Sequence, residues 1–330
     1  MFHSGMDHSR LPGIFCLLLL LACGCNDPGY ELRRAAYEGN AATVEKILKA
    51  HPELINAREK PMPVVAVAPG APRGSTEWVN KLFEPKGNAF HYCNQSGMTP
   101  LHMAARTERE DIVKLLLSHK ADVNATNFYD FTPLCETAWR NTKPALVTLL
   151  LDAKADLNRK DRYGHTPLEW AAIYGNTNAA KAFIKHGAQV NATNVSGMTP
   201  LHQAAIRGHE PMVRLLLSHN AAINDQDAGG NTPLNWAASQ GQYHVIVLLV
   251  ESGGDVNVVN NEGFSPLYRV VQTDTRRIHP VFRLALIDLL LTKKAQVNVT
   301  NMFGVTLLQG AFRGGDTNVV NRLRQHGITE

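Results

Sequence analysis

The sequence predicts an all-α protein, a solenoid of about eight helix-turn-helix units with projecting hairpin tips. A short motif recurs with a nearly fixed period, and the successive copies start 33, 34, 33, 33, 33 and 41 residues apart. Such self-similarity indicates one supersecondary unit stacked on copies of itself, each touching only its neighbours. The copies are TPLHMAA at 99–105, TPLCETA at 132–138, TPLEWAA at 166–172, TPLHQAA at 199–205, TPLNWAA at 232–238, SPLYRVV at 265–271 and TLLQGAF at 306–312.

The motif itself reads as the start of a helix. Thr99 can cap the helix, and Pro100 suits the first turn, where a missing N–H costs nothing. Leu101, Ala104 and Ala105 then form an apolar face, and the small alanines allow a second helix to approach closely. Each copy therefore predicts a first helix with one buried side.

A second helix and a turn complete each unit. In the stretch IVKLLLSH, at 112–119, the apolar residues Ile112, Leu115 and Leu116 fall at helical spacing. The segment 121–127 leaves that helix, and a glycine stands two or three residues before the next one. Glycine provides the positive φ that a tight turn requires. The glycines in this position are Gly97, Gly164, Gly197, Gly230 and Gly263.

This motif and period closely resemble the ankyrin repeat, over about residues 30–330. The resemblance implies a degenerate first unit near 31–40 and a last unit whose outward face is polar, with Arg322, Arg324 and Gln325. It also implies that the motif histidines His102 and His202 bond to backbone and brace neighbouring units. Proteins of this family generally bind partners through the hairpin tips and the first helices, which line a concave face.

Two insertions interrupt the regular spacing. The first covers roughly 59–94 and falls at a hairpin tip, the edge that borders the concave face. The second covers about 272–280, between the two helices of the seventh unit. It carries Arg276, Arg277 and His279, and we expect it on the opposite edge.

Composition and motifs argue against catalysis and against nucleic-acid binding. The net charge of +4 comes from 33 basic and 29 acidic residues that are evenly spread, whereas nucleic-acid surfaces need clustered Lys and Arg. No zinc-protease, phosphate-loop or serine-hydrolase motif is present, so we expect no metal, no cofactor and no small-molecule substrate. Five cysteines exclude a disulfide-dense scaffold. Cys135 replaces the motif histidine and should face the core, although a disulfide with Cys93 is an alternative.

The first residues predict an export signal. Residues 14–22 are uniformly apolar but too few to span a bilayer, so 1–22 reads as a signal peptide. The sequence LLACGC at 20–25 resembles the lipobox of bacterial lipoproteins, which implies a lipid (palmitate-type) modification at Cys23 or, as the rival, Cys25. Residues 23–29 would form a short tether. A soluble secreted protein, cut by ordinary signal peptidase, is the alternative.

Aromatic and basic residues at the variable positions predict where a partner binds. Tyr, Trp and Arg are the residues most enriched at binding hot spots. The predicted binding residues are Phe128, Tyr129, Trp139, Arg140, Arg162, Tyr163, His165 and Tyr174. The structural alternative is that Phe131 and Trp139 pack inward. Such packing would compensate for Asp130 in a glycine position and for the missing motif histidine.

The sequence as a whole predicts a non-catalytic protein-binding scaffold. Its expected location is a bacterial cell envelope, lipid-anchored, with the outer membrane and a periplasm-facing position favoured. Two other functions stay open: a secreted effector or toxin-like protein that acts on another cell, and an accessory subunit of an envelope enzyme with its chemistry in 59–94.

Overall fold

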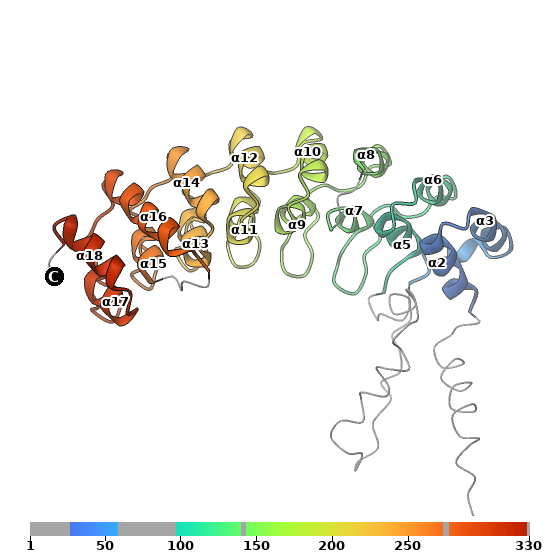
Figure 1. Ribbon diagram of the computed structural model, residues 1–330. Coiled ribbons are helices and arrows are strands. Elements are labelled where there is room, and N and C mark those ends of the chain that lie inside the picture. Colours follow the sequence, from blue (N-terminus) through green and yellow to red (C-terminus); the bar gives the residue numbers. More distant parts are fainter. Residues whose placement is uncertain (1–26, 59–96, 140–142, 273–276, 329–330) are drawn as a thin grey trace, which may run out of the picture. The chain divides into compact units, whose positions relative to one another are not determined.

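The computed structural model describes residues 27–58, 97–139, 143–272 and 277–328, and these form pairs of helices joined by turns (Figure 1). The chain divides into two compact bodies. The first holds the residues up to Glu136 together with Asp152–Ala155, and the second holds Thr137–Leu151 and the residues from Asp156 onward. The predicted leader, Cys23, Cys25 and the insertion with Cys93 lie outside the described residues.

The first body contains the N-terminal helix pairs. Its helices are α2 (Pro28–Glu38), α3 (Ala41–Ala50), the 3₁₀ turn η1 (Pro52–Asn56), α5 (Pro100–Arg106), α6 (Glu110–Ser118) and the short α7 (Pro133–Glu136). Within this body α2 packs on α5 and α5 on α7, so first helices follow one another.

The second body continues the same pattern from α8 onward. Its helices are α8 (Pro144–Asp152, all but the last residue), α9 (Pro167–Tyr174), α10 (Thr177–Lys185), α11 (Pro200–Arg207), α12 (Glu210–Ser218), α13 (Pro233–Gln240), α14 (Tyr243–Glu251), α15 (Pro266–Gln272), α16 (Pro280–Thr292), α17 (Leu307–Arg313) and α18 (Thr317–Gln325). First helices contact first helices from α9 to α17, and α12, α14 and α16 contact one another in turn. We number the eight pairs of consecutive helices in the described residues repeats 1 to 8, from α2–α3 to α17–α18. The predicted all-α repeat array is therefore confirmed.

The recurring threonine caps the first helices as predicted. The Thr99 hydroxyl accepts a hydrogen bond from the backbone N–H of His102, and Pro100 opens α5. Thr166, Thr199, Thr232 and Thr306 cap α9, α11, α13 and α17 in the same way. Each cap satisfies an N–H that has no partner inside the helix, which explains why helices of only seven or eight residues start at fixed places.

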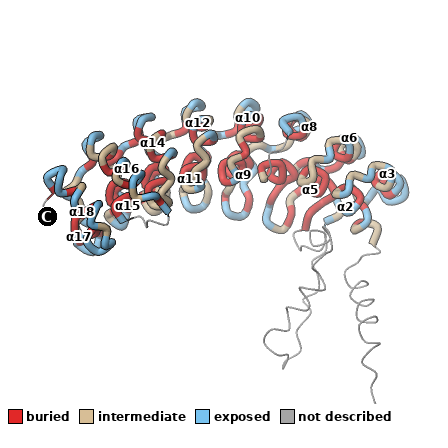
Figure 2. Tube along the Cα trace, in the orientation of Figure 1, coloured by how far each residue is buried: buried red, intermediate tan, exposed pale blue. Residues whose placement is uncertain are grey.

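The core consists of the faces that the helices turn toward one another, shown as the buried stretches in Figure 2. Leu216 of α12 has no exposed surface, and Ala204 and Ala205 of α11 are equally buried. Since alanines allow close helix contact, the apolar stripe predicted from the motif is the one that packs. Helices this short are marginal alone, so burial between repeats holds them together.

The fourth position of the motif braces one repeat to the next. His102 Nε2 lies 2.9 Å from the Phe131 carbonyl, and His202 Nε2 lies 3.0 Å from the Asn231 carbonyl. At the same position in repeat 6, Asn235 Nδ2 donates to the Phe264 carbonyl at 3.1 Å. The bracing role expected of the histidines is thus confirmed, and other side chains perform it too.

One of two expectations about side-chain positions needs correction. Arg322 does not stand on a free face, because its guanidinium pairs with Asp288 of α16 at 3.0 Å, while Arg324 and Gln325 are exposed. Arg277 lies where it was expected, in the loop between the two helices of repeat 7. It follows α15 and hydrogen-bonds to the end of α13, which is a first helix.

Candidate functional site

One buried carboxylate organises the turn that precedes α9. Asp161 Oδ1 accepts the backbone N–H groups of Tyr163 at 2.8 Å and of His165 at 2.9 Å. Its Oδ2 accepts the indole N–H of Trp170 at 2.9 Å. Gly164 completes the turn at a φ of 80°, which an L side chain rarely adopts. These hydrogen bonds therefore fix the position of the turn relative to the exposed side of α9.

Five aromatic side chains gather beside this turn and form what we call the aromatic cluster: Trp139, Tyr163, His165, Trp170 and Tyr174. The rings of Trp139, Trp170 and Tyr174 stack on one another, with centroids 5.2–5.9 Å apart. His165 lies 4.9 Å from Trp170 and 6.1 Å from Tyr163.

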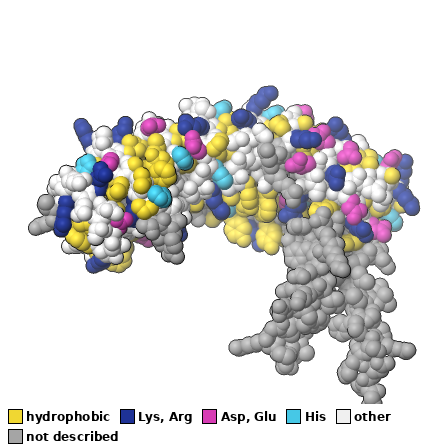
Figure 3. Space-filling model, in the orientation of Figure 1, with side chains coloured by type: hydrophobic (Ala, Val, Ile, Leu, Met, Phe, Trp, Pro, Cys, Tyr) yellow, Lys and Arg dark blue, Asp and Glu magenta, His cyan; other side chains and the backbone are white. Residues whose placement is uncertain are grey.

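The cluster is ordered yet accessible. Tyr163 is 49% exposed and Tyr174 is 42% exposed, whereas Trp139 and Trp170 are half-buried. Hydrophobic side chains gather at the surface below α9 in Figure 3. Aromatic rings in offset or tilted contact stabilise one another, so the cluster presents a pre-formed apolar surface rather than loose side chains.

The structure brings together four of the eight predicted binding residues. Trp139, Tyr163, His165 and Tyr174 belong to the cluster, and Arg162 is exposed on the same turn. Arg140 lies outside the described residues. The remaining two, Phe128 and Tyr129, belong to the first body and are described below.

The hairpin tip of the first body carries its own aromatic residues. Tyr129 is 41% exposed. Phe128 covers Gly97 so closely that a Cβ there would come within 2.6 Å of the ring. Phe131 is buried, and Asp130 adopts a φ of 61° where other turns have glycine. The inward packing weighed for Phe131 is therefore confirmed, and Tyr129 is the accessible ring of this tip.

Within the aromatic cluster, His165 lies between two acidic side chains. Its Nδ1 is 3.3 Å from Asp161 Oδ2, and its Nε2 is 3.8 Å from Glu169 Oε1. Burial opposes protonation of His165, but the hydrogen bond to Asp161 and the charges of both carboxylates outweigh it and raise the His165 pKa. Burial also favours the neutral form of Asp161, yet the hydrogen bonds from His165 and Trp170 lower the Asp161 pKa.

Glu169 is the least solvated member of this group. Burial raises the Glu169 pKa to about 7, against the opposing effects of His165 and of hydrogen bonds from Gln203 and Asn194. Its Oε1 accepts from Asn194 Nδ2 at 2.6 Å and from Gln203 Nε2 at 3.2 Å, while its buried Oε2 has no hydrogen-bond partner. The site therefore holds a carboxyl group that changes charge near neutral pH.

Trp170 is the member of the cluster that the sequence did not single out. It occupies the fifth motif position, after the apolar leucine and one polar residue, and the same position holds Trp236 in repeat 6. Both indoles donate to an aspartate of the preceding turn, Asp161 at 2.9 Å and Asp227 at 2.7 Å. The recurrence of Trp nine residues after Asp was the available signal.

Neither a metal centre nor a membrane-spanning helix is seen in the described part of the chain. Among residues 27–58, 97–139, 143–272 and 277–328, no group of three His, Cys, Asp or Glu side chains could hold a metal ion. None of the helices described in these ranges is long and apolar enough to cross a bilayer. Cys135 is buried, and its Sγ lies 3.4 Å from the Thr132 hydroxyl, which donates to it.

Comparison with known proteins agrees with the repeat geometry. The sequence model of a family described as ankyrin repeats (3 copies) matches residues 32–127, 64–161, 128–194 and 192–260, in overlapping segments. No curated protein matches the chain significantly. Because these segments cover more than half of the chain and coincide with its helix pairs, the protein belongs to the ankyrin repeat family.

Proposed function

We propose that this chain is a non-catalytic binding protein whose principal contact with a protein partner is the aromatic cluster. The observation that carries the proposal is the set of stacked, partly exposed rings fixed by the Trp170–Asp161 hydrogen bond. Ankyrin repeats are protein-interaction modules, and Trp and Tyr dominate the energetics of protein interfaces. Rings that are already ordered lose little conformational entropy on binding.

The edges of the cluster give the partner polar groups to match. Arg162 and Tyr163 are exposed beside the stacked rings, and Tyr174, the exposed ring of the stack, also carries a hydroxyl group. This arrangement, with apolar rings inside and polar groups at the rim, is the usual anatomy of a non-obligate interface.

The test is a quantitative pull-down followed by affinity measurement. The full chain and the Tyr163→Ala, Trp139→Ala and Tyr174→Ala variants are compared for captured proteins by mass spectrometry. A partner of the cluster should be depleted in all three, and each change should weaken its measured affinity by roughly 1–3 kcal/mol. Circular dichroism must show that Trp139→Ala remains folded, since that ring is half-buried.

Matched controls come from the second helices. Lys114 of α6 and Arg214 of α12 are exposed and pair with glutamates of their own helices, Glu110 and Glu210. Their alanine variants should bind every partner as the unchanged chain does. A set of captured proteins that is the same in the cluster variants and in these controls would refute the proposed site.

We further propose that the mature chain is exported and lipid-anchored in a bacterial envelope. Support comes from the apolar stretch at 14–22 and the lipobox-like LLACGC at 20–25. A diacylglyceryl group together with an N-acyl chain holds a protein stably at a membrane, whereas one acyl chain binds marginally. The favoured location is the outer membrane, with the repeats facing the periplasm.

Metabolic labelling tests the anchor. The unchanged chain should incorporate labelled palmitate and fractionate with membranes, and the double variant Cys23→Ser with Cys25→Ser should do neither. Single variants then identify the modified cysteine. Label retained in the double variant contradicts lipidation at these residues, and release of the unchanged chain into the medium contradicts anchoring.

A further inference from the structure

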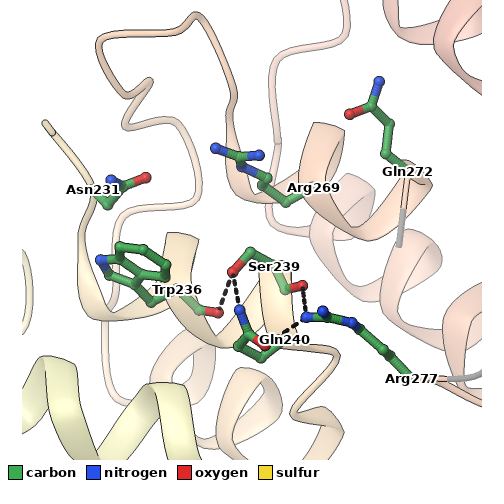
Figure 4. A pocket seen from close by; sticks show the side chains of 7 residues that line it. All are labelled: Asn231, Trp236, Ser239, Gln240, Arg269, Gln272 and Arg277. Atoms are coloured by element: carbon green, nitrogen blue, oxygen red, sulfur yellow. Dashed lines mark hydrogen bonds between the residues drawn. The ribbon is translucent and has the colours of Figure 1, made fainter. Parts of the chain in front are cut away.

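The first helices of repeats 6 and 7 border an open hollow of about 400 Å³ (Figure 4). Its lining is polar and basic around one aromatic wall, unlike the aromatic cluster of repeats 3 and 4. The lining residues that matter here are Trp236, Ser239, Gln240, Arg269 and Arg277.

The hollow is open because of two side chains on α13. Trp236 is the counterpart of Trp170, and its indole N–H is held by Asp227 at 2.7 Å. In repeat 4, three and four residues after Trp170, the chain carries the buried Ile173 and the exposed Tyr174, and Tyr174 stacks on Trp170. In repeat 6 the same positions carry Ser239 and Gln240. No aromatic ring in the described part of the chain stacks on this indole, so it forms a wall instead of the centre of a stack.

The second insertion supplies one cation of this hollow. A Cβ at Gly241, the residue after α13, would lie 3.0 Å from the Arg277 carbonyl oxygen, so Arg277 lies directly against the end of α13. Its guanidinium NH1 donates to Gln240 Oε1 at 2.5 Å and to the Ser239 carbonyl at 3.4 Å. Figure 4 shows Arg277 reaching toward Ser239 and Gln240.

Among the described residues that line or border the hollow, the charges other than that of Arg277 have close polar partners. Arg269 pairs with Glu262 at 3.0 Å and lies over the Phe264 ring at 4.0 Å. Asp227 is occupied by N–H donors, among them the indole of Trp236. The partners of Arg277 in the described structure are neutral oxygens, and no described carboxylate lies within ion-pair distance of it.

We propose that this hollow binds an aspartate or glutamate side chain of an acidic peptide segment in a protein partner. A planar carboxylate matches the guanidinium fork of Arg277 and forms charge-assisted hydrogen bonds with it. Trp236 offers an apolar wall for the methylene groups that precede the carboxylate. Repeats 6 and 7 thus add a specificity element that does not depend on the aromatic cluster.

Selection from a random peptide library tests the proposal on the full chain. Displayed twelve-residue peptides are selected on the unchanged chain with counter-selection on Arg277→Gln. The enriched peptides should share an aspartate or glutamate, and a synthetic copy should lose at least about tenfold in affinity for Arg277→Gln. Replacing the shared acidic residue in the peptide by its amide should cause a similar loss, and the two losses should not add.

Three control variants make the result decisive. Arg277→Lys keeps the charge but not the fork, so its affinity should fall between those of the unchanged chain and Arg277→Gln. Arg207→Gln removes an exposed arginine from the last turn of α11, and Tyr174→Ala alters the aromatic cluster; both should bind the peptide normally. Selected peptides without a shared acid, or equal losses in Arg207→Gln or Tyr174→Ala, would overturn the proposal.

Discussion

Changing His102 to asparagine should remove a pH-dependent part of the stability without removing the brace between repeats. His102 is completely buried, its Nε2–H donates to the Phe131 carbonyl, and its Nδ1 accepts the Thr99 backbone N–H at 3.2 Å. Asn235 makes the same pair of bonds in repeat 6: its Oδ1 accepts from Thr232 N at 3.1 Å, and its Nδ2 donates to the Phe264 carbonyl. The chain itself therefore supplies a non-titrating substitute.

The magnitude follows from the pKa of His102. Burial lowers the pKa from 6.5 to about 4, against the effect of the Phe131 hydrogen bond. Between these values the unfolded chain binds a proton that the folded chain does not, so stability is lost as the pH falls through this window. At about pH 4.5, two pH units below the unfolded value, the loss is about 2–3 kcal/mol, since one unit is worth about 1.4 kcal/mol.

Urea unfolding of the unchanged chain and of His102→Asn, each at about pH 7.5 and about pH 4.5, measures this difference. Other titrating groups affect both proteins alike, so the comparison isolates His102. The unchanged chain should lose about 2–3 kcal/mol more than the variant on acidification. An identical pH dependence in the two proteins would show that His102 does not stay neutral in the fold.

Three further predictions concern stability. Leu216→Ala should lower the free energy of unfolding by about 2–5 kcal/mol, because the side chain is fully buried. Hydrogen exchange should rise mainly in repeat 5 and its neighbours, and a uniform rise across all repeats would contradict local coupling. Gly164→Ala should cost roughly 1–3 kcal/mol, since its Cβ would lie 2.8 Å from the Val195 backbone nitrogen. In the control Gly187→Ala the added Cβ meets no atom within 4 Å, so the thermal midpoint should fall less than in Gly164→Ala. Burial raises the Glu136 pKa to about 7, so the unchanged chain should lose stability as the pH rises from about 4.5 to about 8. Glu136→Gln lacks this titration and should become more stable relative to the unchanged chain over the same range. A difference between their denaturant midpoints that does not change with pH would contradict this prediction.

The fold could be predicted from the sequence because every repeat carries residues of the same type at the helix start, the packed face and the turn. Thr99 and Pro100 start a helix, Ala104 and Ala105 allow close packing, and Gly97 ends the preceding turn at a φ of 69°. Local preference and burial agree at each of these positions, and the pattern recurs every 33 residues or so. When local conformational preference and burial agree in this way, the fold can be predicted from the sequence.

The candidate site was predictable only in part, because its geometry depends on hydrogen bonds that cross the turn. Tyr163 and Tyr174 were found from residue type alone. The position of Trp170 depends on its bond to Asp161, which lies nine residues earlier. Arg277 was expected in the loop between the helices of the seventh unit, but its hydrogen bonds to the end of α13 could not be predicted, since an insertion has no periodic pattern. The positions of both side chains depend on tertiary contacts with irregular segments, which local sequence patterns do not specify.

Side-chain bonds between repeats run in both directions along the chain. In the second body, His202, Asn235 and Tyr268 each reach forward to a carbonyl of the following repeat, at Asn231, Phe264 and Val305. Loss of a repeat from the C-terminal end would strand a buried donor, which is costly. Loss from the N-terminal end would strand donors that reach backward, such as the buried Asn176, whose Nδ2 donates to the Thr137 carbonyl at 3.1 Å, and Gln242, whose Nε2 donates to the Ile206 carbonyl at 3.1 Å. Neither end can therefore gain or shed a repeat without new polar partners for the groups left behind, so a change of length requires a terminal repeat adapted to end the array.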